Sequence, residues 1–386
     1  MNTIAQIGID CVGCRSCEQS CPQKCIHMVE NEEGFLYPMI HMDSCIRCGI
    51  CFRSCPVSVE RKTTGKPLQV HAFRAKDSNR LFHSASGGAA DIATKEVLDK
   101  NGVVNGAAYD HDLKVSHIEV TETSEAKRLQ SSKYVQSDIG NTYRQAKLKL
   151  QEGHIVLFTG TPCQIAGLYS FLDKTYENLF TIDLVCHGVP SPLLFEKYLE
   201  WYGNKKGEKV ESYNFRSKQK RGWGTQYLIK IKTKTKINTN ILSLDRYGKH
   251  FMLGDCYRES CYRCRFANTN RPADLTIGDF WGIEKCHPEF SSHLGVSVVL
   301  SNTKNGQRLL DWMKKDADII PATLDEALVK QGNLIHPTKR PTMRDSFYLN
   351  LAKDDFIDKL HVGLQLKERI KSILPRDIVA ILKRKV

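Results

Sequence analysis

Residues 11–25 read CVGCRSCEQSCPQKC, and residues 45–56 read CIRCGICFRSCP. Each run follows the pattern C-x2-C-x2-C-x3-C with a proline behind it, which is typical of bacterial proteins that carry two iron–sulfur clusters. In such proteins the fourth cysteine of each run ligates the other cluster. The spacing therefore predicts one [4Fe-4S] cluster on Cys11, Cys14, Cys17 and Cys55, and a second on Cys45, Cys48, Cys51 and Cys21.

Two alternatives for these thiols fit the sequence less well. A disulfide framework suits small secreted domains, whereas this chain has 386 residues and begins MNTIAQIGID, without a basic start or an apolar signal core. A zinc ribbon uses two C-x2-C pairs and would leave the third cysteine of each triplet over. Cys25, which follows the first run, is predicted to be a packed free thiol.

The composition limits the other functional classes. With 41% apolar residues the chain can form a sizeable core, and no apolar run approaches the length of a membrane span. We therefore expect a cytoplasmic protein, with a place at the inner face of the membrane as an option. The formal net charge is +13, but its basic residues gather in segments 212–244 and 361–386. No nucleic-acid-binding module is recognisable, so no nucleic acid partner is expected.

The two basic segments have patterns of their own. Residues 227–237 (YLIKIKTKTKI) alternate strictly and predict one strand. Its lysines, at positions 230, 232, 234 and 236, would form a solvated edge face or a surface for an acidic partner or substrate, with Ile229, Ile231 and Ile237 on the opposite face. Residues 340–386 predict a helical basic tail with an interruption at Pro375. Its apolar stripe suits docking on the core, the more ordinary expectation, or contact with an anionic membrane surface.

The rest of the chain divides into an N-terminal unit and a larger core. Residues 1–62 are expected to form an α+β ferredoxin-like domain, with a hairpin over residues 26–40. Beyond it, strands are predicted at 71–75, 103–109, 115–120, 154–159, 179–185 and 295–300, and helices at 85–100, 139–151, 164–172 and 306–314. Alternation at this interval predicts an α/β layered core, divided into residues 68–160 and 161–335.

Two turns of this core could bind the phosphate of a nucleotide cofactor. SASGGAAD, from Ser84, places a Ser/Gly turn before a helix, and FTGTPCQ, from Phe158, ends a buried strand before the next helix. Ligands of α/β sheets bind beyond the carboxyl ends of strands, and the N–H groups of a helix start favour phosphate. Taken alone, either turn is weak evidence for phosphate binding, because a Ser-Gly-Gly turn is also an ordinary helix cap with room for close packing.

Four more cysteines are candidates for a third cluster. Cys261 and Cys264 form a C-x2-C pair, while Cys163 and Cys186 each follow a predicted core strand. If their loops meet, four thiolates converge on a third [4Fe-4S] cluster. If they do not, Cys163 and Cys186 are packed core thiols. The reserve ligands are Cys256 and Cys286.

Six motifs occur in the order SASGG, KYVQS, GTPCQIAGL, DLVCHGVPSP, SCYRCRF and ADLTIGDFWG. Together they resemble the beta-subunit family of coenzyme F-420 hydrogenases and dehydrogenases, over about residues 68–335. That family includes iron–sulfur flavoenzymes and many bacterial members near polysaccharide biosynthesis genes. The resemblance implies FAD in the α/β core with a [4Fe-4S] cluster nearby. The flavin neighbours that it implies are Ser86, Gly87, Gly88, Lys133, Ser137, Thr159, Gly160, Thr161, Pro162, Gln164, Asp279 and Trp281.

The combined expectation is an iron–sulfur flavoprotein oxidoreductase. Electrons would enter at the N-terminal clusters, pass to the core cluster and reach FAD, which would act on an organic small-molecule substrate. His187 is the candidate catalytic proton donor, although a hydrogen-bonded structural histidine is the more ordinary role. One alternative is an electron-transfer subunit that feeds a redox partner protein and has no substrate of its own. The other is a polysaccharide-assembly protein of the same family without flavin.

Overall fold

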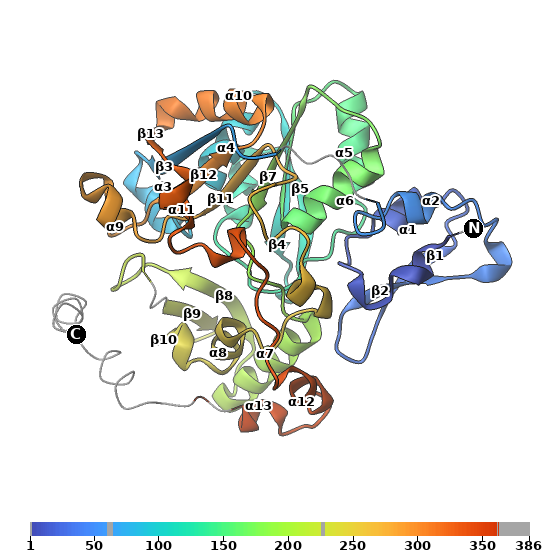
Figure 1. Ribbon diagram of the computed structural model, residues 1–386. Coiled ribbons are helices and arrows are strands. Elements are labelled where there is room, and N and C mark those ends of the chain that lie inside the picture. Colours follow the sequence, from blue (N-terminus) through green and yellow to red (C-terminus); the bar gives the residue numbers. More distant parts are fainter. Residues whose placement is uncertain (1, 60–64, 225–227, 361, 363–386) are drawn as a thin grey trace.

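A mixed sheet of eight strands forms the centre of the molecule. The computed structural model describes residues 2–59, 65–224, 228–360 and 362. The sheet has the strand order β13-β3-β12-β11-β7-β6-β4-β5, and helices cover both of its faces (Figure 1). A three-stranded antiparallel sheet and a two-stranded hairpin accompany it. The predicted α/β layered core is therefore present.

Four parallel strands make up the middle of the large sheet. They are β11 (Leu275–Asp279), β7 (Leu179–Leu184), β6 (Val156–Gly160) and β4 (Val103–Tyr109). Antiparallel strands complete it: β5 (Val115–Val120) on one side, and β12 (Ser297–Ser301), β3 (Gln69–Ala75) and β13 (Ala317–Ala322) on the other. Because the four parallel strands share one direction, their carboxyl ends meet at one edge, where α/β proteins bind ligands. We call it the carboxyl edge.

Each face of the large sheet has its own apolar cluster. Helices α4 (Ala89–Leu98) and α10 (Lys304–Met313) pack on one face with Val104, Leu157 and Ile277. Helices α5 (Thr142–Gln151) and α6 (Pro162–Leu172) pack on the other with Val156 and Phe158. Short helices follow at the sheet margin: α3 (Ser78–His83), α9 (Ile283–Cys286) and α11 (Leu324–Leu328).

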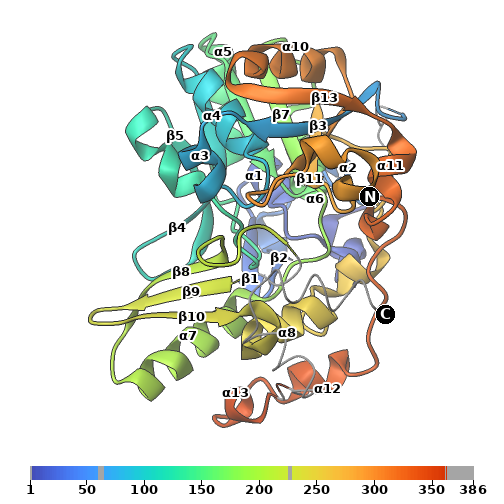
Figure 2. The ribbon, with the colours of Figure 1, turned by 90° about the vertical axis from the view of Figure 1, so that its left-hand side faces the viewer.

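A second layer lies below the large sheet in both views (Figures 1 and 2). It contains α7 (Pro192–Lys206), β8 (Val210–Ser217), β9 (Leu228–Thr233), β10 (Ile237–Ile241), α8 (Arg246–Leu253), α12 (Arg344–Leu349) and α13 (Phe356–Lys359). Its core is rich in aromatic side chains, among them the fully buried Phe215, Tyr198 and Tyr247.

The N-terminal unit lies beside the large sheet, next to α6 (Figure 1). It contains α1 (Ser16–Ser20), α2 (Ile50–Arg53) and the antiparallel hairpin of β1 (Ile26–Glu30) and β2 (Leu36–Ile40). The hairpin predicted over residues 26–40 is thus present. The apolar cluster of this unit consists largely of cysteines, packed with Ile4, Ile26 and Val57.

The junction between β6 and α6 shows how the sequence positions the carboxyl edge. The run Val156–Gly160 is almost entirely apolar and forms a buried central strand. Thr161 then caps the helix: its side chain and that of Gln164 form a capping box, and Pro162 occupies the first helical position. These local signals turn the chain sharply, and they place Cys163 in the first turn of α6.

Two sequence-based expectations are wrong in detail. The strand predicted over residues 227–237 is a hairpin, because β9 ends at Thr233 and the carbonyl of Lys236 accepts a hydrogen bond from the Thr233 N–H at 2.9 Å. Ile237, expected on the face opposite the lysines, is 58% exposed, and β9, expected at a sheet edge, is the middle strand of its sheet. The helix predicted from residue 85 begins at Ala89, because Gly88 has φ +90°.

The predicted tail over residues 340–386 is described only in part. Its first portion contains α12 and α13, and Ile357 and Leu360 are buried in the aromatic layer. Residues 361 and 363–386, including the stripe expected around Pro375, lie outside the described residues. Among the described helices, none has both the length and the apolar character that crossing a membrane requires.

Candidate iron-sulfur centres and cofactor edge

The thiols predicted to hold the first cluster lie together. Cys11, Cys14, Cys17 and Cys55 are each no more than 8% exposed. Burial raises the pKa of the Cys14 thiol well above its usual value, and the nearby Cys55 and Cys17 add to the rise. Burial also raises the pKa of Cys17, with further contributions from Cys11 and Cys55. Mutual effects of this kind require short distances between the sulfurs. We call these four residues the first set.

The second predicted set, Cys21, Cys45, Cys48 and Cys51, has a fifth thiol as its neighbour. Burial raises the pKa of Cys51, and Cys48 and Cys21 contribute in the same direction. The sulfur of Cys25 lies 3.5 Å from that of Cys21. Burial raises the pKa of Cys25 to about 12, and its contacts with Cys21 and Cys45 add to this. Cys25 is therefore packed, and it borders the second set.

The structure also brings Cys163, Cys186, Cys261 and Cys264 together at the carboxyl edge. Burial raises the pKa of Cys186 to about 12, with added effects from Cys163 and Cys264. Burial raises the pKa of Cys261 as well, with added effects from the three other thiols. Cys163 belongs to α6, Cys186 follows β7, and the C-x2-C pair comes from the turn after residue 258. We call these four residues the core set.

The two reserve cysteines lie elsewhere. Cys256 is fully buried in the aromatic layer, where its thiol neighbours Tyr247 and Tyr348. Cys286 ends α9, beside His287.

Helix α6 connects the first set to the core set. Cys163 lies in its first turn, and Gly167 lies one turn later on the same helix face. A Cβ atom at Gly167 would be 2.8 Å from the Cβ of Cys14 and 2.9 Å from its Sγ. The Tyr143 hydroxyl donates a hydrogen bond to the carbonyl of Gln164 at 2.6 Å. It is close to the sulfurs of both Cys14 and Cys163. Burial raises the pKa of Tyr143, and Cys14 and Cys163 raise it further.

The turn that carries the C-x2-C pair makes a second connection to the first set. Arg258 and Ser260 donate hydrogen bonds to the carbonyl of Cys11 at 2.6 and 3.1 Å. Arg265 donates to the carbonyl of Val57 at 2.6 Å, two residues after Cys55. The first set therefore lies against the core set on two sides.

Arginines hold the N-terminal unit against the core. Arg258 is fully buried, stacks on the Tyr37 ring with its guanidinium carbon 4.1 Å from the ring centre, and also donates to the carbonyl of Leu36 at 2.9 Å. Arg344, 3% exposed, pairs with Glu33 in the hairpin turn. Further pairs are made by Arg15 with Asp138, and by Arg144 with the carbonyl of Gln19.

One group of the implied flavin neighbours gathers around Asp279 at the end of β11. Its carboxylate accepts two hydrogen bonds from Arg216, both at 2.8 Å, and one from the Trp223 indole at 2.5 Å. Burial raises the pKa of Asp279, but the Arg216 charge outweighs it, so that the net pKa is lowered. Trp281 stacks on Trp223 with the ring centres 4.7 Å apart. The site thus keeps an ionised carboxylate at the carboxyl edge.

The Ser/Gly turn before α4 joins this group, but its polar atoms already have partners. Ser86 donates to the carbonyl of Val296 at 2.9 Å, and the Gly87 N–H donates to the Ser297 hydroxyl at 2.9 Å. A Cβ at Gly87 would be 2.2 Å from the Phe73 carbonyl. Close packing against the sheet therefore explains Gly87, and Gly88 supplies the left-handed conformation at the helix start.

A second group of implied flavin neighbours lies around the end of β6. The Gln164 amide donates to Ser137, and the Ser137 hydroxyl contacts His117 Nδ1 at 3.0 Å. The other ring nitrogen of His117 lies 2.9 Å from the carbonyl of Thr159. Thr161 and Pro162 start α6. The network fixes the turn after Gly160 in place.

His187, the candidate proton donor, directly follows Cys186. Its side chain is exposed, but desolvation by the surrounding chain still lowers its pKa; Asp279 raises the pKa and Arg216 lowers it, so the imidazole is near both charges. Its backbone carbonyl accepts a hydrogen bond from Thr338 at 2.6 Å. The structure therefore places His187 beside the core set and beside Asp279.

Lys133 lines a basic cavity of about 230 Å³ in this region. The residues around it are Tyr109, Lys127, Arg128, Gln130, Ser131, Ser132, Lys133, Tyr213 and Asn214. No carboxylate is among these nine, and the buried Tyr109 hydroxyl has no hydrogen-bond partner in the described part of the chain. Burial lowers the pKa of Lys133 to about 7, and its ammonium group donates to two backbone carbonyls. This donor set fits an anionic group such as a phosphate.

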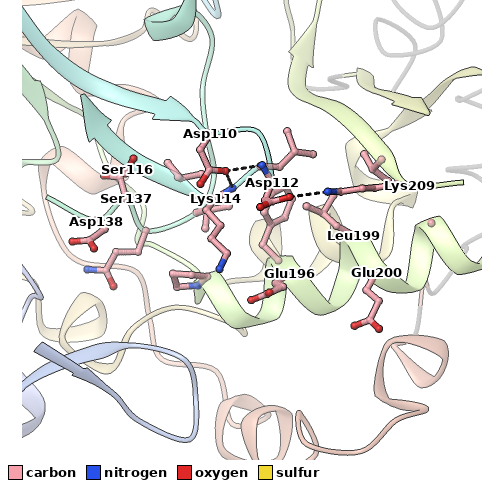
Figure 3. A pocket seen from close by; sticks show the side chains of 18 of the residues that line it. Asp110, Asp112, Lys114, Ser116, Ser137, Asp138, Glu196, Leu199, Glu200 and Lys209 are labelled. Carbon is pink, nitrogen blue, oxygen red and sulfur yellow. Dashed lines mark hydrogen bonds and ion pairs between the residues drawn. The ribbon is translucent and has the colours of Figure 1, made fainter. Parts of the chain in front are cut away.

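A larger cavity, of about 1040 Å³, lies between the N-terminal unit and α7 (Figure 3). Gly13 and Arg15, from the loop of the first set, contribute to its wall. Figure 3 shows Glu196 and Glu200 along α7, and Asp112 in an ion pair with Lys209 at 2.7 Å. Among the implied flavin neighbours, Ser137 lines this cavity. The cavity therefore lies beside the loop of the first set, and acidic residues of α7 line another part of its wall.

Sequence patterns do not single out several residues that organise these sites. Arg216, Trp223 and Arg258 act through partners more than 50 residues away in the chain. Arg216 and Trp223 have no recognisable motif around them, and Arg258 lies just before SCYRCRF without belonging to it. His117 is similar, because it is one of three polar residues in the strand VSHIEV and nothing in that strand distinguishes it.

Comparisons with known proteins match two separate parts of the chain. Residues 153–326 match the family described as the C terminus of the coenzyme F420 hydrogenase/dehydrogenase beta subunit. Residues 10–59 match the 4Fe-4S dicluster domain. A solved chain of the F420-reducing [NiFe] hydrogenase complex from Methanosarcina barkeri, studied by xenon derivatization, is similar with a TM-score of 0.48 and 17% identity. That match covers 72% of this chain and 91% of the other.

Three curated relatives match over short stretches. Ferredoxin-type protein NapF of Haemophilus influenzae is 34% identical over 47 residues, which are 12% of this chain and 27% of NapF. Ferredoxin-1 of Caulobacter vibrioides is 36% identical over 73 residues, covering 17% of this chain and 60% of its own. Ketoisovalerate oxidoreductase subunit VorC of Methanothermobacter marburgensis is 29% identical, covering 18% and 84%. The chain thus spans less than two thirds of the first two relatives. One segment of the chain, residues 10–59, is thus similar to the 4Fe-4S dicluster domain, and a second, residues 153–326, is similar to the C terminus of the coenzyme F420 hydrogenase/dehydrogenase beta subunit.

Proposed function

We propose that the chain is an iron–sulfur flavoprotein oxidoreductase with three [4Fe-4S] clusters and one FAD. The first and second sets of cysteines hold the two N-terminal clusters, and the core set holds the third. FAD occupies the carboxyl edge and acts on an organic substrate. The two family matches support the iron–sulfur and oxidoreductase parts of this proposal. The third cluster, the flavin and the substrate are the proposed extension.

The observation that carries the proposal is the contact between α6 and Cys14. Electron transfer between buried centres slows steeply as their separation grows, so a relay needs its ligands in close contact. Cys163 and Gly167 are one helical turn apart, and Gly167 leaves room for the Cys14 side chain. Cys186 continues the path, because His187 and Asp279 follow it at the carboxyl edge. The first set, the core set and the group around Asp279 thus form one proposed path for electrons, from the N-terminal unit to the carboxyl edge.

The residues of the carboxyl edge fit an anionic flavin cofactor. Lys133 and Lys218 are cations whose ammonium groups donate to backbone carbonyls. Burial lowers the pKa of each to about 7, so a bound phosphate would favour their charged forms. When bound, FAD would supply the conversion between single-electron and two-electron transfer. Asp279 and Arg216 would orient the side chains around the flavin, such as Trp223. His187 would hold a proton beside the substrate.

Anaerobic analysis of iron, sulfide and flavin in the purified full-length chain tests the proposal. Three cubes correspond to about twelve irons and two cubes to about eight. We expect about twelve irons and one flavin for each chain. Replacing Cys261 and Cys264 together by alanine should lower the iron content to about eight, whereas Cys286→Ser, a matched change outside the core set, should leave it unchanged.

Three results would contradict parts of the proposal separately. About eight irons in the unmodified chain would remove the third cluster. Iron without flavin would contradict the FAD assignment and would favour the polysaccharide-assembly alternative. Zinc in place of iron would remove the redox function altogether.

A second candidate function is an electron-transfer subunit that has no substrate of its own. The cavity of about 1040 Å³ favours it, because it opens beside Gly13 and Arg15 in the loop of the first set. A redox partner protein that seats a side chain there would come close to the first cluster. This candidate predicts that the loaded chain alone reduces no small molecule, and that its reduced clusters reoxidise only when the partner is added.

A further inference from the structure

A candidate metal site with mixed ligands lies where α9 and α11 meet, on the opposite side of the large sheet from the N-terminal unit (Figure 1). Cys286 is the last residue of α9, His287 follows it, and Glu326 belongs to the first turn of α11. One sulfur, one ring nitrogen and one carboxylate oxygen from these residues all lie within 4.8 Å of one another. None of the three belongs to the cysteine sets of the proposed clusters.

The imidazole of His287 has the surroundings of a metal ligand. Its Nε2 is buried without a hydrogen-bond partner among the described residues, 3.5 Å from a carboxylate oxygen of Glu326. Its Nδ1 lies 3.6 Å from a carboxylate oxygen of Glu289. These separations are too long for ordinary hydrogen bonds. A histidine that binds a metal through one nitrogen usually directs the other toward a carboxylate, and Glu289 is the carboxylate that faces Nδ1, at 3.6 Å.

The packing below the three side chains fixes their backbones. Ile283, Phe290 and Ala327 are buried in one apolar cluster that joins α9 to α11. Glu326 is further held by a capping box, in which the Thr323 N–H donates to its carboxylate at 2.7 Å. A carboxylate has more acceptor positions than this cap uses. The ligand groups are therefore arranged before any ion arrives.

We propose that Cys286, His287 and Glu326 form a zinc site, with Glu289 as the carboxylate that orients His287. Thiolate, imidazole and carboxylate are the ligand types that zinc prefers, and calcium or magnesium would require oxygen ligands. Three protein ligands leave one position of a tetrahedral ion for water or another molecule. When the zinc–sulfur bond forms, the Cys286 thiol releases its proton to solvent. The site is independent of the proposed redox function.

Zinc retention by the full-length chain tests this site. The clusters are loaded anaerobically, loosely held metal is removed with a chelator, one equivalent of zinc is added, and zinc and iron are measured after desalting. We expect one retained zinc for each chain, and we expect Cys286→Ser and His287→Ala to abolish its retention with the iron content unchanged. His336→Ala, a change at an exposed histidine outside the site, should retain the zinc.

Two further variants probe the chemistry of the ligands. Glu326→Gln keeps a residue that can complete the capping box but removes the negative charge, so the helix should persist while zinc binding weakens. Glu289→Gln should weaken zinc affinity by about 10-fold to 100-fold, as expected for a carboxylate that orients a ligand. If both variants bind zinc with the same affinity as the unmodified chain, Glu326 is not a ligand and Glu289 does not orient His287.

Alkylation of Cys286 provides a readout that does not depend on metal analysis. Cys286 is partly exposed, so iodoacetamide should modify it, and mass spectrometry locates the modified cysteine. Added zinc should slow this modification in the unmodified chain and should have no effect in His287→Ala. The proposal is overturned if no zinc is retained, if Cys286→Ser and His287→Ala retain it equally well, or if zinc leaves the alkylation rate unchanged. The iron count is separate from all three outcomes.

Discussion

Replacing Gly167 by a larger residue should remove the first cluster selectively. A Cβ atom at this position would lie 2.8 Å from Cys14 Cβ, 2.9 Å from Cys14 Sγ and 2.9 Å from the Tyr143 hydroxyl. Non-bonded carbon atoms normally approach to about 3.5–4.0 Å. Cys14 would therefore have to move by roughly 0.7 Å at least, a displacement obtained by comparing these separations with the lower limit of normal contact.

The cost of this change to the whole fold should be small. Crowding a packed site costs about 1–3 kcal/mol, while replacing glycine by alanine inside a helix gains about 1 kcal/mol. The net destabilisation of Gly167→Ala is therefore about 0–2 kcal/mol. Gly167→Val adds two methyl groups and should displace Cys14 further. We expect the valine variant to fold and to contain about four irons fewer than the unmodified chain, equivalent to one cube.

Iron analysis together with thermal unfolding, both performed without air, measures this effect. Gly306→Ala is the matched control, because a Cβ at this glycine of α10 would be 2.2 Å from the Asp274 carbonyl, far from the cysteine sets along the chain. The control should lose stability but keep its iron. If Gly167→Val keeps the full iron content and the same paramagnetic resonance spectrum after reduction, the contact between α6 and the first set has no role in holding the cluster.

Three other changes test separate parts of the structure. Arg258→Met removes a buried guanidinium that donates to two backbone carbonyls of the N-terminal unit, and it should cost about 2–4 kcal/mol in urea unfolding; an unchanged midpoint would exclude this anchoring role. Burial lowers the pKa of Lys133 to about 7 from the ordinary value of 10.5. Between these two values the unfolded chain therefore binds more protons than the folded chain, so the free energy of unfolding should rise from pH 7 toward pH 10. Lys133→Met should flatten part of that rise, which urea unfolding at each pH would measure. Cys25→Ala should keep the iron content of the unmodified chain, while Cys21→Ala should lower it; equal iron losses would make Cys25 a ligand.

The elements that the sequence predicts well are those with local signals. The buried run before Gly160, the capping residues Thr161 and Gln164, and the cysteine spacing of the N-terminal unit each specify structure over a few residues. The predicted strands and helices of the core are accordingly present within a few residues of the expected limits.

The failures come from turns and from long-range contacts. The alternation of residues 227–237 continues through the turn of the β9–β10 hairpin, because lysine and threonine there keep the period of two without a glycine or asparagine to mark the turn. Only the strand order places Cys163 and Cys186, which lie just beyond the ends of the neighbouring strands β6 and β7, near the C-x2-C pair. Arg216 and Arg258 act entirely through tertiary contacts, so no local pattern could identify them.

The arginine contacts between the N-terminal unit and the core restrict how this unit can be exchanged in protein engineering. Without residues 2–59, Arg258 and Arg344 would lose their acceptors in that unit and would leave two cations facing a newly exposed surface. Grafting a foreign ferredoxin in its place would require a backbone carbonyl at the position of Cys11, another at the position of Leu36, and a carboxylate at the position of Glu33. The N-terminal unit is therefore fitted to this core, and a replacement unit would need those three contacts rebuilt.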